Sequence, residues 1–369
     1  MYCWLAVAYG QTWSLHGQVS GWITSNPEIS LVSQTGFRYL PEFSIGEKID
    51  SNLSTDMEIS LNGYAFGNFA MNENPELEKN IKPYRAWLRL ASNSFEARAG
   101  LQKINFGSAT LFRPLMWFDR IDPRDPLQLT DGVTGLLLRY YFLDNTNIWL
   151  WGLYGNTNAK GLEITPTINS SIEYGGRFQL PLLNGEAGFS YHHRNTNMSG
   201  IDALLRNDED ASVPENRIGI DGKWDIGIGV WFEAVIIHTQ TDFPILKYQR
   251  QWTLGADYTF DMGNGLNALT EFFRSENPSK VFSQASGTSF SALEMNYPLG
   301  VIDRLSGILY FDWTNNKWYR FVTWQQTYDN WIFYLLGFWN PKTIQLYQTQ
   351  TGSTSFAGTG IQIMAVFNH

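Results

Sequence analysis

The sequence predicts an all-β protein, a transmembrane antiparallel up-and-down β-barrel of about 18 strands. Three observations lead to this prediction. Apolar and polar residues alternate in many segments, and no long segment has apolar residues at the spacing of an amphipathic helix. Many of these segments run for 10 to 13 residues, which suits a tilted membrane strand of about 9–11 residues better than a soluble strand of about 5–6. Short turns also alternate with longer polar connections along the chain.

The composition fits this class. The 369 residues include 15 Trp, 18 Tyr and 24 Phe, and 17% are charged, against about 25% in a typical soluble protein. Abundant aromatic residues argue against a disordered chain, and the net charge of −9 argues against a partner made of nucleic acid. No run of roughly 18 apolar residues occurs, so we expect no transmembrane helix. A membrane barrel needs apolar side chains only at alternate positions.

Residues 1–10 resemble the end of a secretory signal peptide. An apolar run leads to Ala8-Tyr9-Gly10, a small-x-small pattern typical of a cleavage site. Cleavage before Gln11 would leave residues 11–369 as a single transmembrane barrel. The alternative is a first strand or a frayed terminus. Cys3 is the single cysteine, so no intramolecular disulfide can form.

Alternation within each segment justifies the strands. In DMEISLNGYAF, for example, Ile59 and Leu61 flank the polar Ser60, and the pattern continues on both sides. The weakest strand is 34–45, because Pro41 interrupts it. An even strand number is required if both termini lie on one side of the membrane, so the fallback is 16. The predicted strands are 12–23, 34–45, 53–66, 83–92, 95–105, 132–142, 147–156, 170–181, 186–195, 215–225, 228–240, 248–260, 265–275, 288–297, 304–314, 317–327, 330–340 and 356–367.

The last strand should close the barrel. Pairing of 356–367 with 12–23 would remove both sheet edges, which lipid would not tolerate unpaired. Ile361, Ile363 and Phe367 share one face of this strand, and we expect that face to contact lipid.

Two stretches carry a resemblance to a known family. They are FEARAGLQKINFGSA, residues 95–109, and DPLQLTDGVTGLLLRYYF, residues 125–142. With the long connection between them and an aromatic residue near the C-terminus, the chain resembles a Gram-negative outer-membrane porin, loosely the eighteen-stranded alginate-export-like group. The C-terminal signal of such barrels usually ends on the aromatic residue, whereas here Asn368 and His369 follow Phe367.

The resemblance implies passive passage of small hydrophilic solutes or ions across the bacterial outer membrane, or export of a polysaccharide. The expected surroundings are outer-membrane lipid and lipopolysaccharide. A plugged barrel that serves as a secretion or assembly partner is an alternative, and the sequence leaves open whether the chain forms a homo-oligomer. A soluble all-β binding protein is a further alternative.

Charges at inward positions suggest two walls of the pore. A basic wall facing an acidic wall would create a field across the lumen that discriminates ions. The alternative is that these groups are ordinary water-facing residues. The basic wall consists of Arg85, Arg89, Arg98, Arg139 and Arg177, and the acidic wall consists of Glu233, Asp257, Glu271, Glu294 and Asp312.

Segment 107–132 is unusually apolar for an external loop. It contains three prolines and several aromatic residues, so we expect it to fold inward and narrow the pore. An external cap or a contact with a neighbouring subunit is the alternative. Its aspartates could suggest calcium, but the prolines do not fit an EF-hand loop, and we expect no metal and no cofactor. The candidate constriction residues are Arg113, Trp117, Asp119, Arg120, Asp122, Arg124 and Asp125.

An outer-membrane hydrolase is the least favoured alternative. The candidate bases are His192, His193 and His238, but no Gly-x-Ser-x-Gly motif accompanies them, so we do not expect an enzyme. Inward tryptophans would suit an oligosaccharide, whose C–H faces pack on rings. They are Trp87, Trp149, Trp151 and Trp231.

Overall fold

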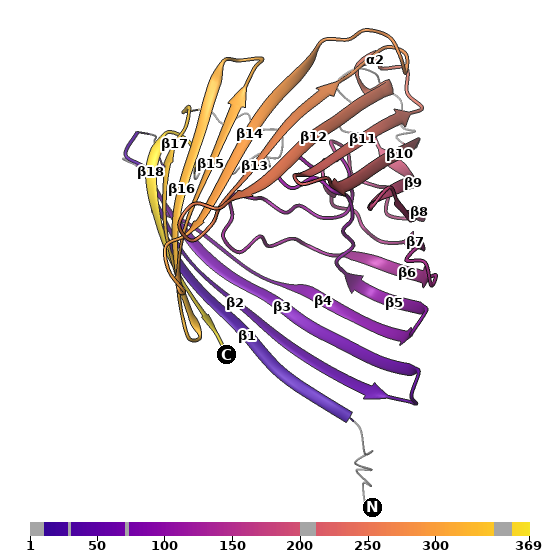
Figure 1. Cartoon of the computed structure of the whole chain (residues 1–369), viewed down its shortest axis with the longest axis horizontal. Helices are drawn as coiled ribbons and strands as arrows, with labels where there is room; N and C mark the ends of the chain where they lie inside the picture. Colours follow the sequence, from indigo (N-terminus) through magenta and orange to yellow (C-terminus); the bar gives the residue numbers. More distant parts are fainter. Residues whose placement is uncertain (1–10, 29–30, 71–73, 200–211, 343–355) are drawn as a thin grey trace, which may run out of the picture.

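The computed structural model describes residues 11–28, 31–70, 74–199, 212–342 and 356–369, which form one closed antiparallel sheet (Figure 1). The sheet has 18 strands. Each strand pairs with the next along the chain, and β18 pairs with β1 to close the barrel. This confirms the predicted up-and-down barrel, its strand number and its closing seam. The predicted signal-peptide remnant, residues 1–10, lies outside the described residues.

The strand bounds follow the predicted alternation closely. The strands are β1 (Gln11–Ser25), β2 (Leu31–Lys48), β3 (Leu53–Ala70), β4 (Glu76–Ser92), β5 (Phe95–Gln102), β6 (Val133–Tyr141), β7 (Asn147–Leu153), β8 (Glu173–Leu182), β9 (Gly185–Asn197), β10 (Ser212–Asp225), β11 (Gly229–Thr239), β12 (Tyr248–Phe260), β13 (Leu266–Glu276), β14 (Gly287–Pro298), β15 (Asp303–Asp312), β16 (Lys317–Tyr328), β17 (Trp331–Trp339) and β18 (Thr359–Asn368). A short helix, α2 (Pro244–Lys247), precedes β12. Within these residues, no helix is long and apolar enough to cross a membrane.

Two of the prolines within strands, Pro41 and Pro83, bear on the predicted strand bounds. Pro41 lies opposite Gly17 inside β2, so this strand exists although it was the weakest prediction. The predicted start of β4 at Pro83 is wrong, because the strand begins at Glu76. A register shift between Ser60 and Leu61 of β3 accommodates Pro83. Proline cannot donate a ladder hydrogen bond, and a bulge lets the strand continue past it.

The C-terminus pairs with the first strand near one rim of the barrel. His369 and Gly17 exchange backbone hydrogen bonds of 2.9 and 3.0 Å. The connections at this rim are short. In the turn between β8 and β9, Leu183 and Asn184 both have positive φ, the conformation that matches strand twist in two-residue hairpins. The longer connections 103–132 and 154–172 leave from the opposite rim.

The two faces of the wall differ in character. On β18, Ile361 and Ile363 are 45% and 58% exposed, whereas Met364 and Val366 are 6% and 0% exposed. The same alternation exposes apolar residues on the outer face around the barrel, including Phe37, Ile59, Leu88, Leu136, Leu150, Ile218, Leu254 and Leu335. Soluble monomers rarely expose contiguous apolar patches above a few hundred Å². The outer face is therefore a surface for lipid.

Candidate functional site

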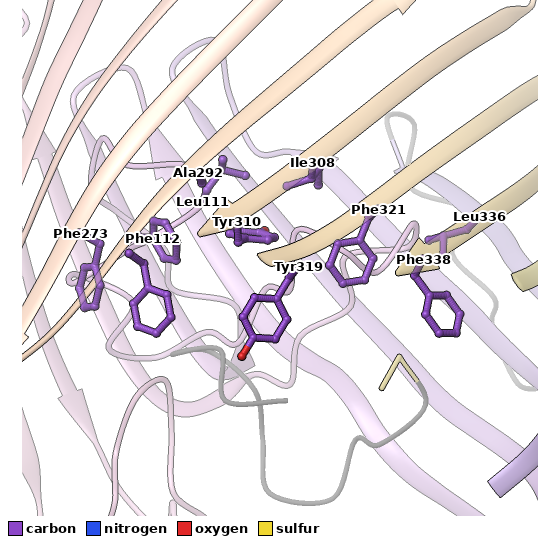
Figure 2. Packing of buried hydrophobic residues seen from close by; sticks show 11 residues of the cluster. Leu111, Phe112, Phe273, Ala292, Ile308, Tyr310, Tyr319, Phe321, Leu336 and Phe338 are labelled. Carbon is purple, nitrogen blue, oxygen red and sulfur yellow. The ribbon is translucent and has the colours of Figure 1, made fainter. Parts of the chain in front are cut away.

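The connection between β5 and β6, residues 103–132, runs between the walls of the barrel (Figure 1). Figure 2 shows Leu111 and Phe112 beside Phe273 and Tyr310 of the wall. The ring of Phe112 lies 5.5 Å from the rings of both Phe273 and Tyr310. These residues belong to a buried cluster that reaches β17 at Phe338. Aromatic packing therefore attaches this part of the connection to the inner face of β13–β17.

A second buried cluster holds the first half of the same connection, from Ile104 to Phe118. Phe106 stacks on Trp151 of β7 at 5.6 Å, and Phe118 meets Trp151 edge-on at 5.4 Å. Trp117 also lies in this cluster, together with Val235 of β11. The apolar residues that made this segment unusual are thus buried against the barrel wall.

Glu233 of β11 binds the backbone of the connection. Its carboxylate accepts hydrogen bonds from the amides of Ala109 at 2.8 Å and Leu115 at 2.9 Å. Gly107 makes this approach possible. Its φ is +103°, and a Cβ atom there would lie 2.3 Å from a Glu233 carboxylate oxygen. Any other residue would be strained in this conformation and would collide with the carboxylate.

Glu271 of β13 binds the next three amides. Thr110, Leu111 and Phe112 donate backbone hydrogen bonds to its carboxylate at 2.7, 2.9 and 2.6 Å. The indole N–H of Trp231 donates to it at 2.9 Å. Both oxygens of Glu271 are therefore occupied within the protein.

This geometry separates the members of the predicted acidic wall. Glu233, Glu271 and Asp312 are at most 1% exposed, and Asp312 accepts amide hydrogen bonds from Thr314 and Asn315. In contrast, Asp257 and Glu294 are partly exposed. The structure thus places two of the five carboxylates against the folded connection rather than opposite the basic wall.

Three members of the predicted basic wall converge on one carboxylate. Nitrogens of Arg98, Arg139 and Arg89 lie 3.0, 3.5 and 3.8 Å from Glu96 of β5. Arg89 also pairs with Asp56 at 2.9 Å. The cluster therefore carries three positive and two negative charges.

The other two members lie apart from this cluster. Arg177 pairs with Asp221 of β10 at 2.6 Å, which neutralises it. Arg85 donates to the backbone oxygen of Thr130 at 3.0 Å and lies 3.9 Å from the ring centroid of Tyr84. In the part of the chain that the structure describes, Arg85 has no carboxylate within ion-pair distance.

A cavity of about 1080 Å³ lies between β2–β4 and two connections, residues 118–132 and 155–161. Its lining is mostly polar and includes Arg38, Asn62, Tyr64, Lys82, Arg120 and Asp125. Sequence reasoning selected Arg120 and Asp125 but missed Arg38, although alternation along β2 places it on the inner face.

Some charged side chains at this cavity form ion pairs and others do not. Lys82 pairs with Asp131 at 2.7 Å. Arg38 lies over the rings of Trp22 and Tyr64, 5.5 and 5.6 Å from their centroids. Across the described ranges, neither Arg38 nor Arg120 has a carboxylate within ion-pair distance. Two guanidinium groups therefore remain without an ionic partner at the cavity.

Asp125, on the loop side of the cavity, is hydrogen-bonded to the backbone of its own loop. It accepts hydrogen bonds from the amides of Leu127 and Leu129, which lower the pKa of its carboxyl. Burial is the larger effect and raises this pKa above its ordinary value. The charge of Arg38 also lowers this pKa, so Arg38 and Asp125 interact electrostatically at the cavity.

The remaining constriction candidates pair with one another. Arg113 and Asp119 form a buried ion pair of 2.7 Å, and Arg124 and Asp122 form one of 2.6 Å. These pairs stabilise the folded connection internally. Of the predicted constriction residues, Arg120 and Asp125 face the cavity.

A second connection, residues 154–172, is held by a buried ionic network. Glu163 contacts Arg194 and Arg217, each at 3.0 Å, and Lys160 contacts Glu173 at 3.0 Å. The side chain of Glu163 is fully buried. This network fixes residues 155–161, which form one side of the cavity.

Glu163→Gln should destabilise the barrel by about 3–5 kcal/mol, because removing one partner of a buried ion pair leaves uncompensated charge. The midpoint temperature at which the folded, fast-migrating band disappears on SDS gels should fall. Glu186→Gln on β9 is the control, since that exposed carboxylate only accepts a hydrogen bond from Gln179. Equal midpoints for the two variants would contradict the structural role of Glu163.

The candidate hydrolase histidines do not meet at one site. His192 is buried and accepts a hydrogen bond from the indole of Trp151 at 3.1 Å, with Glu173 at 3.2 Å on its other side. His193 stacks on Tyr174, and His238 stacks on Tyr248. Among the described residues, no three His, Cys, Asp or Glu side chains are grouped as a metal ion would require.

Comparison with known proteins identifies the fold. No family model and no curated protein matches the chain. Similar solved structures include Salmonella typhi OmpF in complex with daunomycin, with 11% identity, 98% of both chains covered and a TM-score of 0.52. An anion-selective porin from Comamonas acidovorans has 13% identity over 97% of this chain and 100% of its own, with a TM-score of 0.52. Acinetobacter baumannii OccAB1 has 8% identity over 97% and 95%, with a TM-score of 0.56.

At such low identities the likeness concerns the fold. It supports the predicted resemblance to porins, but none of the three is described as an alginate exporter, so the narrower subgroup is not supported. A closed barrel with an apolar outer face and this fold belongs to the outer membrane of Gram-negative bacteria.

Proposed function

We propose that this chain is a porin that allows small hydrophilic solutes and ions to cross the outer membrane passively. The observation that carries the proposal is the cavity of about 1080 Å³ beside β2–β4. The opposite part of the lumen is filled, because the two apolar clusters pack the connection 103–132 onto β6–β7 and β11–β17. The passage is therefore off-centre, and residues 118–132 form its constriction.

The unpaired charges favour anions. Arg38, Arg85 and Arg120 have no carboxylate within ion-pair distance among the residues described, and water-poor pores strengthen the effect of such charges. The field across the lumen would then arise from the basic wall and these arginines. Glu233 and Glu271 would contribute less, since both are buried behind the connection.

A second candidate solute is an oligosaccharide. Amide and phenol groups line the cavity, among them Gln34, Asn62 and Tyr64. On β4–β7, Arg98 lies 4.7 Å from the ring centroid of Trp87, and Arg139 lies 3.8 Å from the ring centroid of Trp149. Each guanidinium group covers one face of its ring, so the C–H face of a sugar would stack on the other face. Export of a whole polysaccharide would need a wider passage than a cavity bounded on two sides by folded connections.

Swelling of liposomes that contain the purified barrel tests this function. Uncharged sugars of increasing size should enter at decreasing rates, and the smallest should cause rapid swelling relative to liposomes without protein. Absence of swelling with protein that migrates as a folded barrel on unheated SDS gels would contradict a porin. It would favour a plugged barrel that acts as a secretion or assembly partner.

A further inference from the structure

We infer that Glu233 and Glu271 are positioning residues that set the bore of the pore from behind the constriction. This inference rests on the proposed function. The two carboxylates belong to β11 and β13, on the side of the barrel away from β2–β4. They bind residues 109–115 of the connection and thereby fix where residues 118–132 lie.

Several charge-assisted hydrogen bonds join the connection to the two carboxylates. Five backbone amides donate to two carboxylates, two to Glu233 and three to Glu271, at 2.6 to 2.9 Å. Hydrogen bonds to an ionised acceptor are shorter and roughly twice as strong as neutral ones. The hydroxyl of Thr253 adds a bond of 2.7 Å to the carbonyl of Phe112.

The two carboxylates have no cationic partner among the described residues. Both carboxylates are buried, at 0% and 1% exposure. Within the described ranges, no Lys, Arg or His nitrogen lies within 4.0 Å of either carboxylate. A buried charge requires compensation, and here the amides of the connection and the indole of Trp231 supply it. Withdrawal of the connection would leave both carboxylates without most of their donors.

Two glycines lie where the connection and the wall come into close contact. A Cβ atom at Gly219 of β10 would lie 2.4 Å from Leu115, and one at Gly107 would lie 2.3 Å from Glu233. Gly219 leaves room on the wall for the side chain of Leu115, and Gly107 lets the backbone of the connection approach Glu233 closely. We call Glu233, Glu271 and residues 109–115 the loop clasp.

The experiment compares Glu233→Gln, Glu271→Gln and the double variant with Glu294→Gln. Glutamine keeps the size of the side chain but presents an amide N–H₂ to the amide donors of the connection. Glu294 lies on the neighbouring β14 and accepts a hydrogen bond from Asn296, so its variant matches the loss of one charge in each single variant without touching the clasp.

Two readouts are recorded for each variant. The first is the labelling rate of Leu111→Cys, in a chain with Cys3→Ser, by a membrane-impermeant maleimide, because Leu111 is fully buried in the clasp. The second is single-channel current in a planar bilayer. The double variant should label at least about tenfold faster than its Glu294→Gln counterpart, since a charge-assisted bond has been lost at each site. Its current should be larger and noisier.

Unchanged labelling in a folded double variant would overturn the inference. If the wild-type chain conducts and labelling is unchanged, the clasp is wrong and the porin function stands. If the wild-type chain does not conduct but labelling rises, the clasp is right and the porin function is wrong. If the double variant does not fold, Glu271→Asp provides the test, because its shorter carboxylate keeps the charge but withdraws from the amides. It should label faster than Glu294→Asp, and equal rates would overturn the inference.

Discussion

Deletion of residues 112–124 should raise single-channel conductance severalfold. This segment contributes Phe112, Trp117 and Phe118 to the two apolar clusters that fill the lumen beside β6–β7 and β11–β17. Without it, water would enter the space that those side chains occupy, and the conducting cross-section would widen. The effect should be the largest of any single change, because a large part of the constriction is removed rather than one charge.

The deletion is measured in planar bilayers beside full-length protein refolded in the same way. Both proteins must migrate as folded barrels on unheated SDS gels, which shows that the wall is intact. A folded deletion variant with unchanged conductance would contradict the account. The narrowest part of the pore would then lie elsewhere, for example beside residues 155–161, which line the same cavity.

Neutralisation of Arg85, Arg89 and Arg98 together should shift ion selectivity towards cations. The change removes three positive charges from the wall. It also releases Asp56 from Arg89 and leaves Glu96 with Arg139 as its remaining arginine neighbour. The inner wall at β3–β6 would therefore change from net positive to net negative.

The reversal potential in a salt gradient measures this shift. Low ionic strength is preferred, since the screening length is about 10 Å at 0.1 M salt and grows as salt falls. Arg274→Gln is the control, because Arg274 pairs with Glu276 near the end of β13 and alternates with the inward Phe273. A triple variant with the wild-type reversal potential would contradict a role for the basic wall in selectivity.

Period-two alternation was sufficient to predict the barrel. Successive side chains of a barrel strand face lipid on the outside and water or packed side chains on the inside. Apolar and polar residues therefore alternate along each strand. Ile361 and Ile363 therefore predicted the outer face of β18 correctly. Strand ends were less predictable. At Pro83, a bulge allowed β4 to continue where proline suggested a boundary.

The interior of the pore was less predictable for a physical reason. Alternation places Glu233 and Glu271 on the inner face, but it does not say whether they meet water or protein. That depends on the path of residues 103–132, which has no periodic pattern. The contact between Glu271 and Phe112 joins residues far apart in sequence through a backbone amide. Every residue except proline has such an amide, so the sequence does not show which amides bind the carboxylate.

Arg38 illustrates the opposite case. Alternation in β2 is enough to place its guanidinium on the inner face, although Arg38 was not among the predicted site residues. The sequence does not show that it lacks a carboxylate partner. The pairs Arg177–Asp221 and Arg89–Asp56 show why this matters. Charges that appear equivalent in a sequence are neutralised or not according to the register of neighbouring strands.

Single-channel recording of the purified, folded protein in a planar bilayer with a salt gradient tests the central claim most directly. The account predicts steady current steps and a reversal potential of the sign that anion preference gives. Arg38 and Arg120 line the passage without a carboxylate within ion-pair distance among the described residues, and they outnumber Glu78, whose carboxylate accepts a hydrogen bond from Tyr64. Steady steps with cation preference would contradict the assignment of selectivity to Arg38, Arg85 and Arg120. No current from protein that is shown to be folded would contradict the passage itself.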